Sequence, residues 1–243
     1  MKKGTLYGIG VGPGDPELVT IKAAYLLQNI KIIFAPFSSK NTYSLALDII
    51  SPYIKRDTQV IKLSFPMTKD ENVLEDAWNR NAEIIVSYLN KGEDCAFVTL
   101  GDPMTYSTFG YIKKVIEEEY PDIAIKIIPG ITSYHAAAAR AGKILAESEE
   151  SFVVISGAMG AEKLRKAIHC ADHIVVLKVY KNFSEIKDAL EEMNLIDKAV
   201  LVSRCGLEGE EVVEDIRSKD ITPSYLSLLI IDNKGGLKKD EQP

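Results

Sequence analysis

The sequence predicts an α/β protein with two α/β domains, in which the N-terminal sheet is mainly parallel and the C-terminal sheet is mixed. Apolar, β-favouring runs alternate with segments of helical periodicity from residue 5 to residue 141. A polar and charged stretch interrupts this pattern at residues 142–150, and further apolar runs follow it. Strands that alternate with helices build parallel sheets, because a parallel connection needs a crossover.

The interruption also predicts the domain organisation. We expect an N-terminal α/β domain over residues 1–142, a linker at about 143–149 and a C-terminal α/β domain over residues 150–243. A chain of 243 residues with 46% apolar residues can bury a core in each domain.

The alternation predicts each element in order. In the N-terminal domain we expect strands over 5–11, 30–35, 60–63, 95–99 and 123–128. Helices are expected between them over 18–29, 43–54, 73–90 and 109–119, and an alanine-rich helix ends at 141. In the C-terminal domain we expect strands over 152–156, 173–178, 199–205 and 226–232, with helices near 161–171 and 183–193.

Charge and cysteine content narrow the function classes. A net charge of −6 disfavours non-specific binding to nucleic acid. The chain has three cysteines, Cys95, Cys170 and Cys205, which is an odd number without a CxxC pair. This argues against a disulfide framework and a structural zinc site. No run reaches the roughly 18 apolar residues of a membrane span, and no signal-type segment opens the sequence. We therefore expect a soluble, cytoplasmic protein.

The first strand ends in a glycine-rich loop that does not fit the dinucleotide-binding fingerprint. The pattern G-x-G-x-x-G fails from Gly8, where its third glycine would fall on Pro13, and from Gly10, where it would fall on Asp15. The sequence also lacks a G-x-x-x-x-G-K-[ST] phosphate loop. We therefore do not expect the ligand to be a nucleotide diphosphate.

A second loop, Gly101-Asp102-Pro103, follows the strand expected at 95–99. Open α/β sheets bind ligands at the carboxyl ends of their strands, so this loop is placed like a site. Gly101 permits close approach of a ligand to the backbone, and Pro103 biases Asp102 towards an extended conformation. The alternative interpretation is that Gly-Asp-Pro only makes a turn.

A third loop, Pro129-Gly130-Ile131-Thr132-Ser133, follows the strand expected at 123–128. Because this strand belongs to the same parallel sheet, the loop could face the same cleft as Asp102. Thr132 and Ser133 also suit the N-cap of the following helix, and that structural role would explain them equally well.

Together these loops resemble the tetrapyrrole methyltransferase superfamily. The motifs are Gly8-Ile-Gly-Val-Gly-Pro-Gly-Asp-Pro-Glu17, Gly101-Asp102-Pro103 and Pro129-Gly130-Ile131-Thr132-Ser133, and their order and spacing match over nearly the whole chain. The resemblance implies two α/β domains and a homodimer. It also implies that the cofactor S-adenosylmethionine binds in the cleft between the domains and leaves as S-adenosylhomocysteine. It implies no protein-bound metal.

By the same resemblance the cofactor lies against residues of both domains. Backbone groups and short hydroxyls can bind a neutral adenosine and a zwitterionic methionine. The implied cofactor residues are Pro13, Leu100, Gly101, Asp102, Thr105, Thr132, Ser133, Tyr180 and Cys205.

Within the superfamily the chain is similar to the branch that methylates C20 of precorrin-2 or cobalt-factor II in cobalamin synthesis. The similarity lies in Ser64-Phe65-Pro66-Met67-Thr68-Lys69-Asp70, in Trp78 and in the loop of Asp102. The uroporphyrinogen-III branch typically carries Tyr-Asp-Arg-Leu after the second strand, where this chain has Phe34-Ala35-Pro36-Phe37-Ser38-Ser39-Lys40. The carboxylate proposed as a base in that branch therefore has no counterpart here.

Other functions stay open. Within the superfamily they are methylation of C11 or C17 of a corrin, and the diphthine synthase activity. From another class, a nicotinamide-dependent dehydrogenase is disfavoured by the failed fingerprint. A cobalt chelatase would need metal ligands such as His169, Cys170 and His173, but Ala171-Asp172 breaks the helical geometry that this spacing requires.

The implied reaction moves a methyl group from a sulfonium to a nucleophilic ring carbon. Alignment of the reacting atoms can contribute roughly 7–11 kcal/mol, so no dedicated nucleophile is expected. Tyr106 is a catalytic candidate that would orient the macrocycle or its proton. Basic side chains would bind the substrate carboxylates, and Lys178 and Arg204 rank first because each lies near a strand end. The other candidates, which can equally be solvated surface, are Lys40, Lys69, Arg80 and Arg140.

Overall fold

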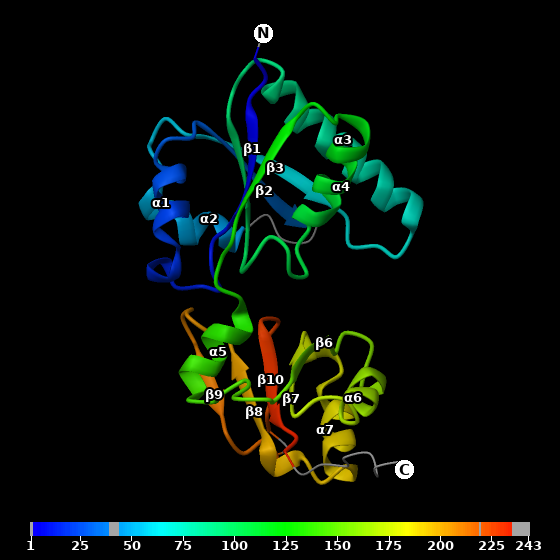
Figure 1. Ribbon diagram of the computed structural model, residues 1–243. Helices are drawn as coiled ribbons and strands as arrows, with labels where there is room; N and C mark the ends of the chain where they lie inside the picture. Colours follow the sequence, from blue (N-terminus) through cyan, green and yellow to red (C-terminus); the bar gives the residue numbers. More distant parts are fainter. Residues whose placement is uncertain (1, 39–43, 219, 235–243) are drawn as a thin grey trace. The chain divides into compact units, whose positions relative to one another are not determined.

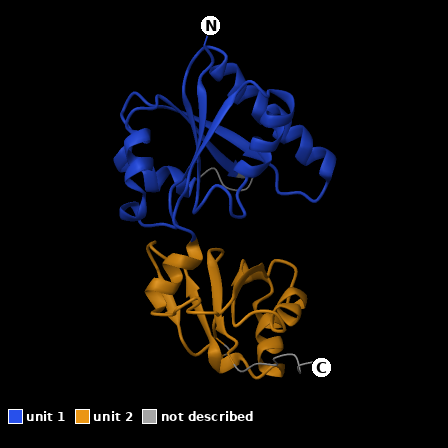
Figure 2. Ribbon diagram, in the orientation of Figure 1, with its two compact units in different colours: residues 1–132 blue, residues 133–243 orange. Residues whose placement is uncertain are grey.

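The protein consists of two compact units, residues 1–132 and 133–243 (Figure 2). The computed structural model describes residues 2–38, 44–218 and 220–234. The division falls before the boundary expected at 142, so the alanine-rich helix α5 (Ser133–Ala141) groups with the second unit. The candidate Lys40 lies outside the described residues.

The first unit contains a five-stranded parallel sheet in the order β3-β2-β4-β1-β5. Its strands are β1 (Thr5–Gly10), β2 (Ile32–Ser38), β3 (Gln59–Phe65), β4 (Cys95–Thr99) and β5 (Ala124–Ile128). All five residues of β4 are buried, as the apolar run predicted. Parallel pairing brings the carboxyl ends of β1, β4 and β5 to one edge, where Gly10 is opposite Thr99 and Ile9 is opposite Ile128.

Helices cover both faces of this sheet (Figure 1). On one face, α3 (Glu71–Leu89) and α4 (Phe109–Glu119) pack against Phe34 and Phe97. On the other, α1 (Ile21–Leu27) and α2 (Leu45–Ile50) pack against Ile9 and Val98. The first unit therefore has three layers, with the sheet in the middle.

Local caps set where the helices begin. The Thr20 hydroxyl accepts a hydrogen bond from the Ala23 N–H at 3.3 Å, so α1 begins at Ile21 and a separate 3-10 turn forms over Pro16–Leu18. The helix expected over 18–29 is thus shorter, Ile21–Leu27, and the 3-10 turn shares only Leu18 with the expected range. The Asp70 carboxylate caps α3 by accepting from the N–H groups of Asn72 and Val73.

The second unit contains a mixed sheet in the order β6-β7-β10-β8-β9. Its strands are β6 (Phe152–Ser156), β7 (His173–Leu177), β8 (Ala199–Ser203), β9 (Glu211–Val213) and β10 (Ser227–Asp232). Only β6 and β7 pair in parallel, because β10 runs antiparallel to both β7 and β8. Strand β9 was missed by the sequence analysis, since it has three residues and two of them are exposed.

One apolar core fills the second unit. Helices α6 (Glu162–Ala167) and α7 (Phe183–Glu192) cover one face of the sheet and bury Ile174, Leu201 and Leu229. Helix α5 contacts β8 and β10. These two sheets confirm the predicted α/β fold class. Among the described residues, no helix combines the length and apolar character needed to cross a membrane.

Candidate functional site

The three glycine-containing loops of the first unit meet at the carboxyl edge of its sheet. Gly101 donates to the Gly12 carbonyl at 2.7 Å and accepts from the Gly12 N–H at 3.3 Å, so the loops after β1 and β4 are bonded to each other. A Cβ on Gly10 would lie 2.5 Å from the Gly101 carbonyl oxygen, and one on Gly130 would lie closer still. Only glycine fits at these two positions, because the three backbones touch.

Asp102 fastens two of these loops. One carboxylate oxygen accepts from the Met104 N–H at 2.9 Å, within its own loop, and the other accepts from the Gly130 N–H at 3.0 Å. The side chain is thus more than part of a turn, because it links the end of β4 to the end of β5. Backbone N–H groups held by a carboxylate keep a loop in one geometry.

Hydroxyl groups order the loop that follows Asp102. The hydroxyls of Thr99 and Ser107 are 2.9 Å apart, and the Ser107 hydroxyl accepts from the Phe109 N–H at the start of α4. Tyr106, directly before Ser107, has a positive φ of 51° and is 55% exposed. A non-glycine residue in this left-handed region carries strain, which often marks a functional site.

The first-unit cofactor candidates share the same edge. Pro13 is buried in the loop after β1. Strand β4 is fully buried, whereas the candidates from the other two loops are half-buried. These candidates are Leu100, Gly101, Asp102, Thr105 and Thr132. The edge therefore presents backbone groups, short hydroxyls and one carboxylate that already has backbone partners.

The second unit brings its own candidates to one edge of its sheet. Lys178 follows the end of β7, and Arg204 follows the end of β8. Because β7 and β8 are both antiparallel to β10, they run in the same direction and end at the same edge. Both residues adopt positive φ, 60° for Lys178 and 52° for Arg204, as Tyr106 does in the first unit.

Aromatic and hydroxyl side chains line the same edge. Tyr180 and Tyr225 pack edge to face with ring centroids 5.1 Å apart. The buried hydroxyls of Ser203 and Ser227 lie 2.7 Å apart and join β8 to β10. The sequence analysis missed Tyr225, which is 61% exposed and lies in a loop without a glycine or charge motif.

Cys205 lies in the turn between β8 and β9, next to a charged pair. The Glu210 carboxylate accepts from the Gly206 N–H at 2.5 Å and pairs with Arg140 of α5 at 3.1 Å. Burial, followed by the nearby Glu210 charge, raises the pKa of the Cys205 thiol to about 11. Cys205 is therefore a neutral thiol at neutral pH, suited to packing rather than to nucleophilic attack.

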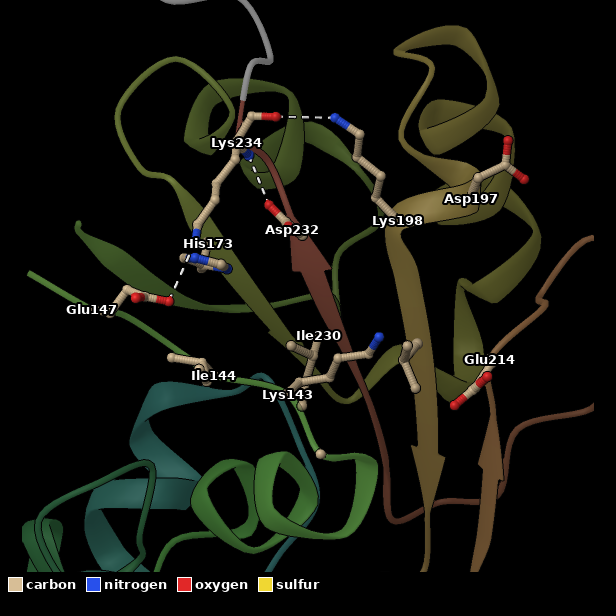
Figure 3. A pocket seen from close by; sticks show the side chains of 12 residues that line it. Lys143, Ile144, Glu147, His173, Asp197, Lys198, Glu214, Ile230, Asp232 and Lys234 are labelled. Atoms are coloured by element: carbon tan, nitrogen blue, oxygen red, sulfur yellow. Dashed lines mark hydrogen bonds and ion pairs between the residues drawn. The ribbon is translucent and has the colours of Figure 1, made fainter.

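The opposite edge of the second sheet holds a pocket of about 490 Å³ (Figure 3). Its residues come from the segment that follows α5, from the starts of β7 and β8, and from the ends of β9 and β10. Lys234 pairs with Glu150 at 2.6 Å, and Glu150 also contacts the buried His173 at 3.1 Å. None of the predicted cofactor, substrate or catalytic residues that the structure describes lines this pocket. Throughout the described parts of the chain, no group of three or more His, Cys, Asp or Glu could hold a metal.

Comparison with known sequences identifies a family. The family model described as Tetrapyrrole (Corrin/Porphyrin) Methylases matches residues 5–218. A relative from Salmonella typhimurium, named cobalt-precorrin-2 C(20)-methyltransferase, is 34% identical over 95% of this chain and 97% of its own length. A relative from Methanocaldococcus jannaschii, named as a probable enzyme of the same kind, is 34% identical over 93% of this chain and 95% of its own length.

Solved structures share the fold. A cobalt precorrin-4 methyltransferase superposes with a TM-score of 0.70 at 22% identity, covering 93% of this chain and 94% of its own. A uroporphyrin-III C-methyltransferase from Thermus thermophilus, solved with S-adenosylhomocysteine, gives a TM-score of 0.63 at 20% identity and covers 94% of this chain and 97% of its own.

Proposed function

This chain belongs to the tetrapyrrole (corrin/porphyrin) methylase family, and from that premise we propose that it transfers a methyl group from S-adenosylmethionine to C20 of a precorrin-2-type tetrapyrrole in cobalamin synthesis. One observation carries the proposal: a bacterial and an archaeal relative, each 34% identical over almost the full length, have the same named activity. The cobalt-containing substrate is favoured, because both relatives are named for cobalt-precorrin-2.

The loops of the first unit fit the proposed cofactor. Leu100, Gly101, Thr105 and Thr132 offer backbone groups and short hydroxyls in a half-buried setting, which suits adenosine and a zwitterionic methionine. Asp102 is proposed to act mainly by holding these loops, since both of its carboxylate oxygens bond backbone N–H groups. The bound cofactor would supply an activated methyl group, and the chain would supply alignment and exclusion of water.

Further cofactor residues are proposed from the family resemblance. They are Pro13 of the first unit and, from the second unit, Ser133, Tyr180 and Cys205. Tyr180 can give an aromatic surface for adenine, and the neutral Cys205 thiol can pack against it. The proposed chemistry needs no protein-bound metal, because the sulfonium of the cofactor already activates the methyl group.

Substrate residues are proposed at exposed strand-end positions. Lys178 and Arg204 are exposed cations at the carboxyl edge of the second sheet, where they can bind the carboxylates of a tetrapyrrole. Tyr106 is proposed as a catalytic residue that orients the macrocycle or its proton. Its exposed ring and left-handed backbone support this role.

We also propose a homodimer in a reducing compartment, the cytoplasm. Three free cysteines, including the exposed Cys170, suit such a compartment. Light scattering after size exclusion tests the dimer, and a monomer at micromolar concentration would contradict it.

The activity is tested by anaerobic incubation of the purified protein with S-adenosylmethionine and, in parallel, precorrin-2 and its cobalt-containing form. Product mass and NMR report the number and position of the added methyl groups. One methyl at C20 in the cobalt-containing reaction is the expected result. A methyl at C11 or C17 would assign another reaction of the family, and no methyl in either tube would reject the proposed substrates.

A further inference from the structure

Glu210 connects two elements of the second unit. It is the last residue before β9, and its two carboxylate oxygens have different partners. One accepts a hydrogen bond from the Gly206 N–H at 2.5 Å, and the other pairs with the Arg140 Nε atom at 3.1 Å. The Glu210 side chain is only 23% exposed, so this carboxylate is largely removed from water and needs these partners.

The turn that Glu210 holds contains one residue with backbone strain, Arg204. Between β8 and β9 the backbone takes positive φ at Arg204, Gly206 and Gly209. Backbone hydrogen bonds fix only part of it, from Leu207 to Arg204 and from Glu210 to Leu207. The Gly206 N–H is bonded by the Glu210 side chain instead. Loss of the carboxylate would leave this half-buried donor unpaired and free the turn to change conformation.

The two elements joined by Glu210 both carry proposed cofactor residues. Cys205 lies in the turn, directly before Gly206, and Ser133 is the first residue of α5, the helix that carries Arg140. The Arg140–Glu210 pair therefore fixes the turn against α5. Arg140 was a candidate for a substrate carboxylate, but in the structure its partner is a carboxylate of the protein.

We propose that Glu210 is a positioning residue of the methyl-transfer site, and that its hydrogen bond to Gly206 and its ion pair with Arg140 hold Cys205 and α5 in the geometry that binds S-adenosylmethionine. This inference rests on the proposed function, because it assumes that Cys205 and Ser133 contact the cofactor. Neither Glu210 nor Arg140 needs to touch the cofactor for this role.

The test measures S-adenosylhomocysteine affinity by calorimetry in the full-length protein. Glu210→Ala removes both contacts, and we expect its Kd to rise about tenfold or more. Glu210→Gln keeps an oxygen acceptor for the Gly206 N–H but loses the charge, so its Kd should rise less. Arg140→Met removes only the ion pair, and the double variant Glu210→Gln/Arg140→Met should be no worse than the more affected single variant.

Two readouts separate positioning from a general loss of structure. In steady-state kinetics, the KM for S-adenosylmethionine should rise, while kcat at saturating cofactor stays within about twofold. Removal of the Glu210 charge should also lower the pKa of Cys205 from about 11, so Cys205 of Glu210→Gln should react faster with iodoacetamide at pH 9. Cys95 is the internal reference, since burial raises the pKa of its thiol to about 12.

Glu192→Gln is the matched control. It breaks a different ion pair of the second unit, with Arg165 at 2.6 Å, and should leave the Kd unchanged. Wild-type affinity in both Glu210 variants would overturn the inference, and so would an equal loss in Glu192→Gln. If the wild-type protein itself does not bind S-adenosylhomocysteine, the proposed function fails, and the Cys205 labelling still tests the contact between Glu210 and the turn.

Discussion

The Asp102 carboxylate accepts a hydrogen bond from the Gly130 N–H at 3.0 Å, across 28 residues of sequence. The same carboxylate holds the Met104 N–H of its own loop at 2.9 Å. Two loops of the first unit that carry proposed cofactor residues are therefore fixed to each other by one side chain. Asp102 resembles Glu210 of the second unit, since each carboxylate accepts a hydrogen bond from a glycine N–H in a loop that carries a proposed cofactor residue.

This relationship predicts the effect of Asp102→Ala. Loss of both hydrogen bonds should let the loops after β4 and β5 separate, and we expect the Kd for S-adenosylhomocysteine to rise at least tenfold by calorimetry. Asp70→Ala is the matched control, because it also removes a carboxylate that accepts from two backbone N–H groups, at the start of α3. The control should lower stability by about 1 kcal/mol without changing affinity. Unchanged affinity in Asp102→Ala would remove Asp102 from the site.

The close approach of the loops predicts that Gly130 tolerates no side chain. A Cβ there would overlap the Gly101 carbonyl oxygen, so Gly130→Ala should destabilise the protein by about 2–4 kcal/mol in denaturant unfolding. Gly110→Ala is the control, because a Cβ at Gly110 would meet no neighbouring side chain or backbone within 4 Å and this residue lies in the first turn of α4. Alanine loses less conformational freedom on folding than glycine, so the control should be at least as stable as wild type. Equal stability of the two variants would contradict the packing of the three loops.

The sequence predicted the fold class, because buried strands produce apolar runs that can be read locally. Strand β4 is a clear case, since all of its residues are buried in the middle of the sheet. The prediction was wrong where local signals compete. Thr20 caps α1, so this helix begins at Ile21 instead of residue 18, and β2 extends through Pro36 to Ser38. Pro36 is tolerated because β4 pairs with β2 only as far as Phe34.

The site was predictable only in part. Glycine and proline marked the loops of the first unit, and the resemblance of these loops to the tetrapyrrole methyltransferases is confirmed by the family match. The contacts that hold the loops were not predictable, since Asp102 meets Gly130 and Glu210 meets Arg140 only after the chain has folded. Strand β9 and Tyr225 could not be predicted from the sequence. A strand of three residues is too short for a hydrophobic pattern, and isolated exposed tyrosines are common on protein surfaces.

Glu150 predicts a pH dependence of stability. The hydrogen bond from Lys234 is the largest cause that holds the pKa of Glu150 below its ordinary value of 4.5. Its contribution to stability is therefore complete above about pH 4.5 and is lost as the pH falls through the lowered pKa. Glu150→Gln should be less stable than wild type at pH 7, and the difference should shrink on acidification in urea unfolding. Glu118→Gln, which breaks an exposed pair 3.9 Å from Lys114, should match wild type throughout. A difference that persists undiminished at pH 3 would show that the Glu150 charge is not its cause.

Charge reversal at Lys178 and Arg204 tests the substrate residues. A tetrapyrrole with several carboxylates should be attracted by exposed cations at the edge of the second sheet, although the whole chain has a net charge of −6. We expect Lys178→Glu and Arg204→Glu to raise the KM for the tetrapyrrole about tenfold each, with smaller effects at high salt, because screening weakens charge attraction beyond about 8 Å. The KM for S-adenosylmethionine should change little, which separates this effect from that of Asp102→Ala.

Lys163→Glu, on the exposed side of α6, is the control, because it carries the same charge change away from this edge. It should leave the KM values for the tetrapyrrole and for S-adenosylmethionine unchanged. If both reversals leave the tetrapyrrole KM at the wild-type value, other cations bind the substrate carboxylates, and Lys69 and Arg80 of the first unit become the next candidates.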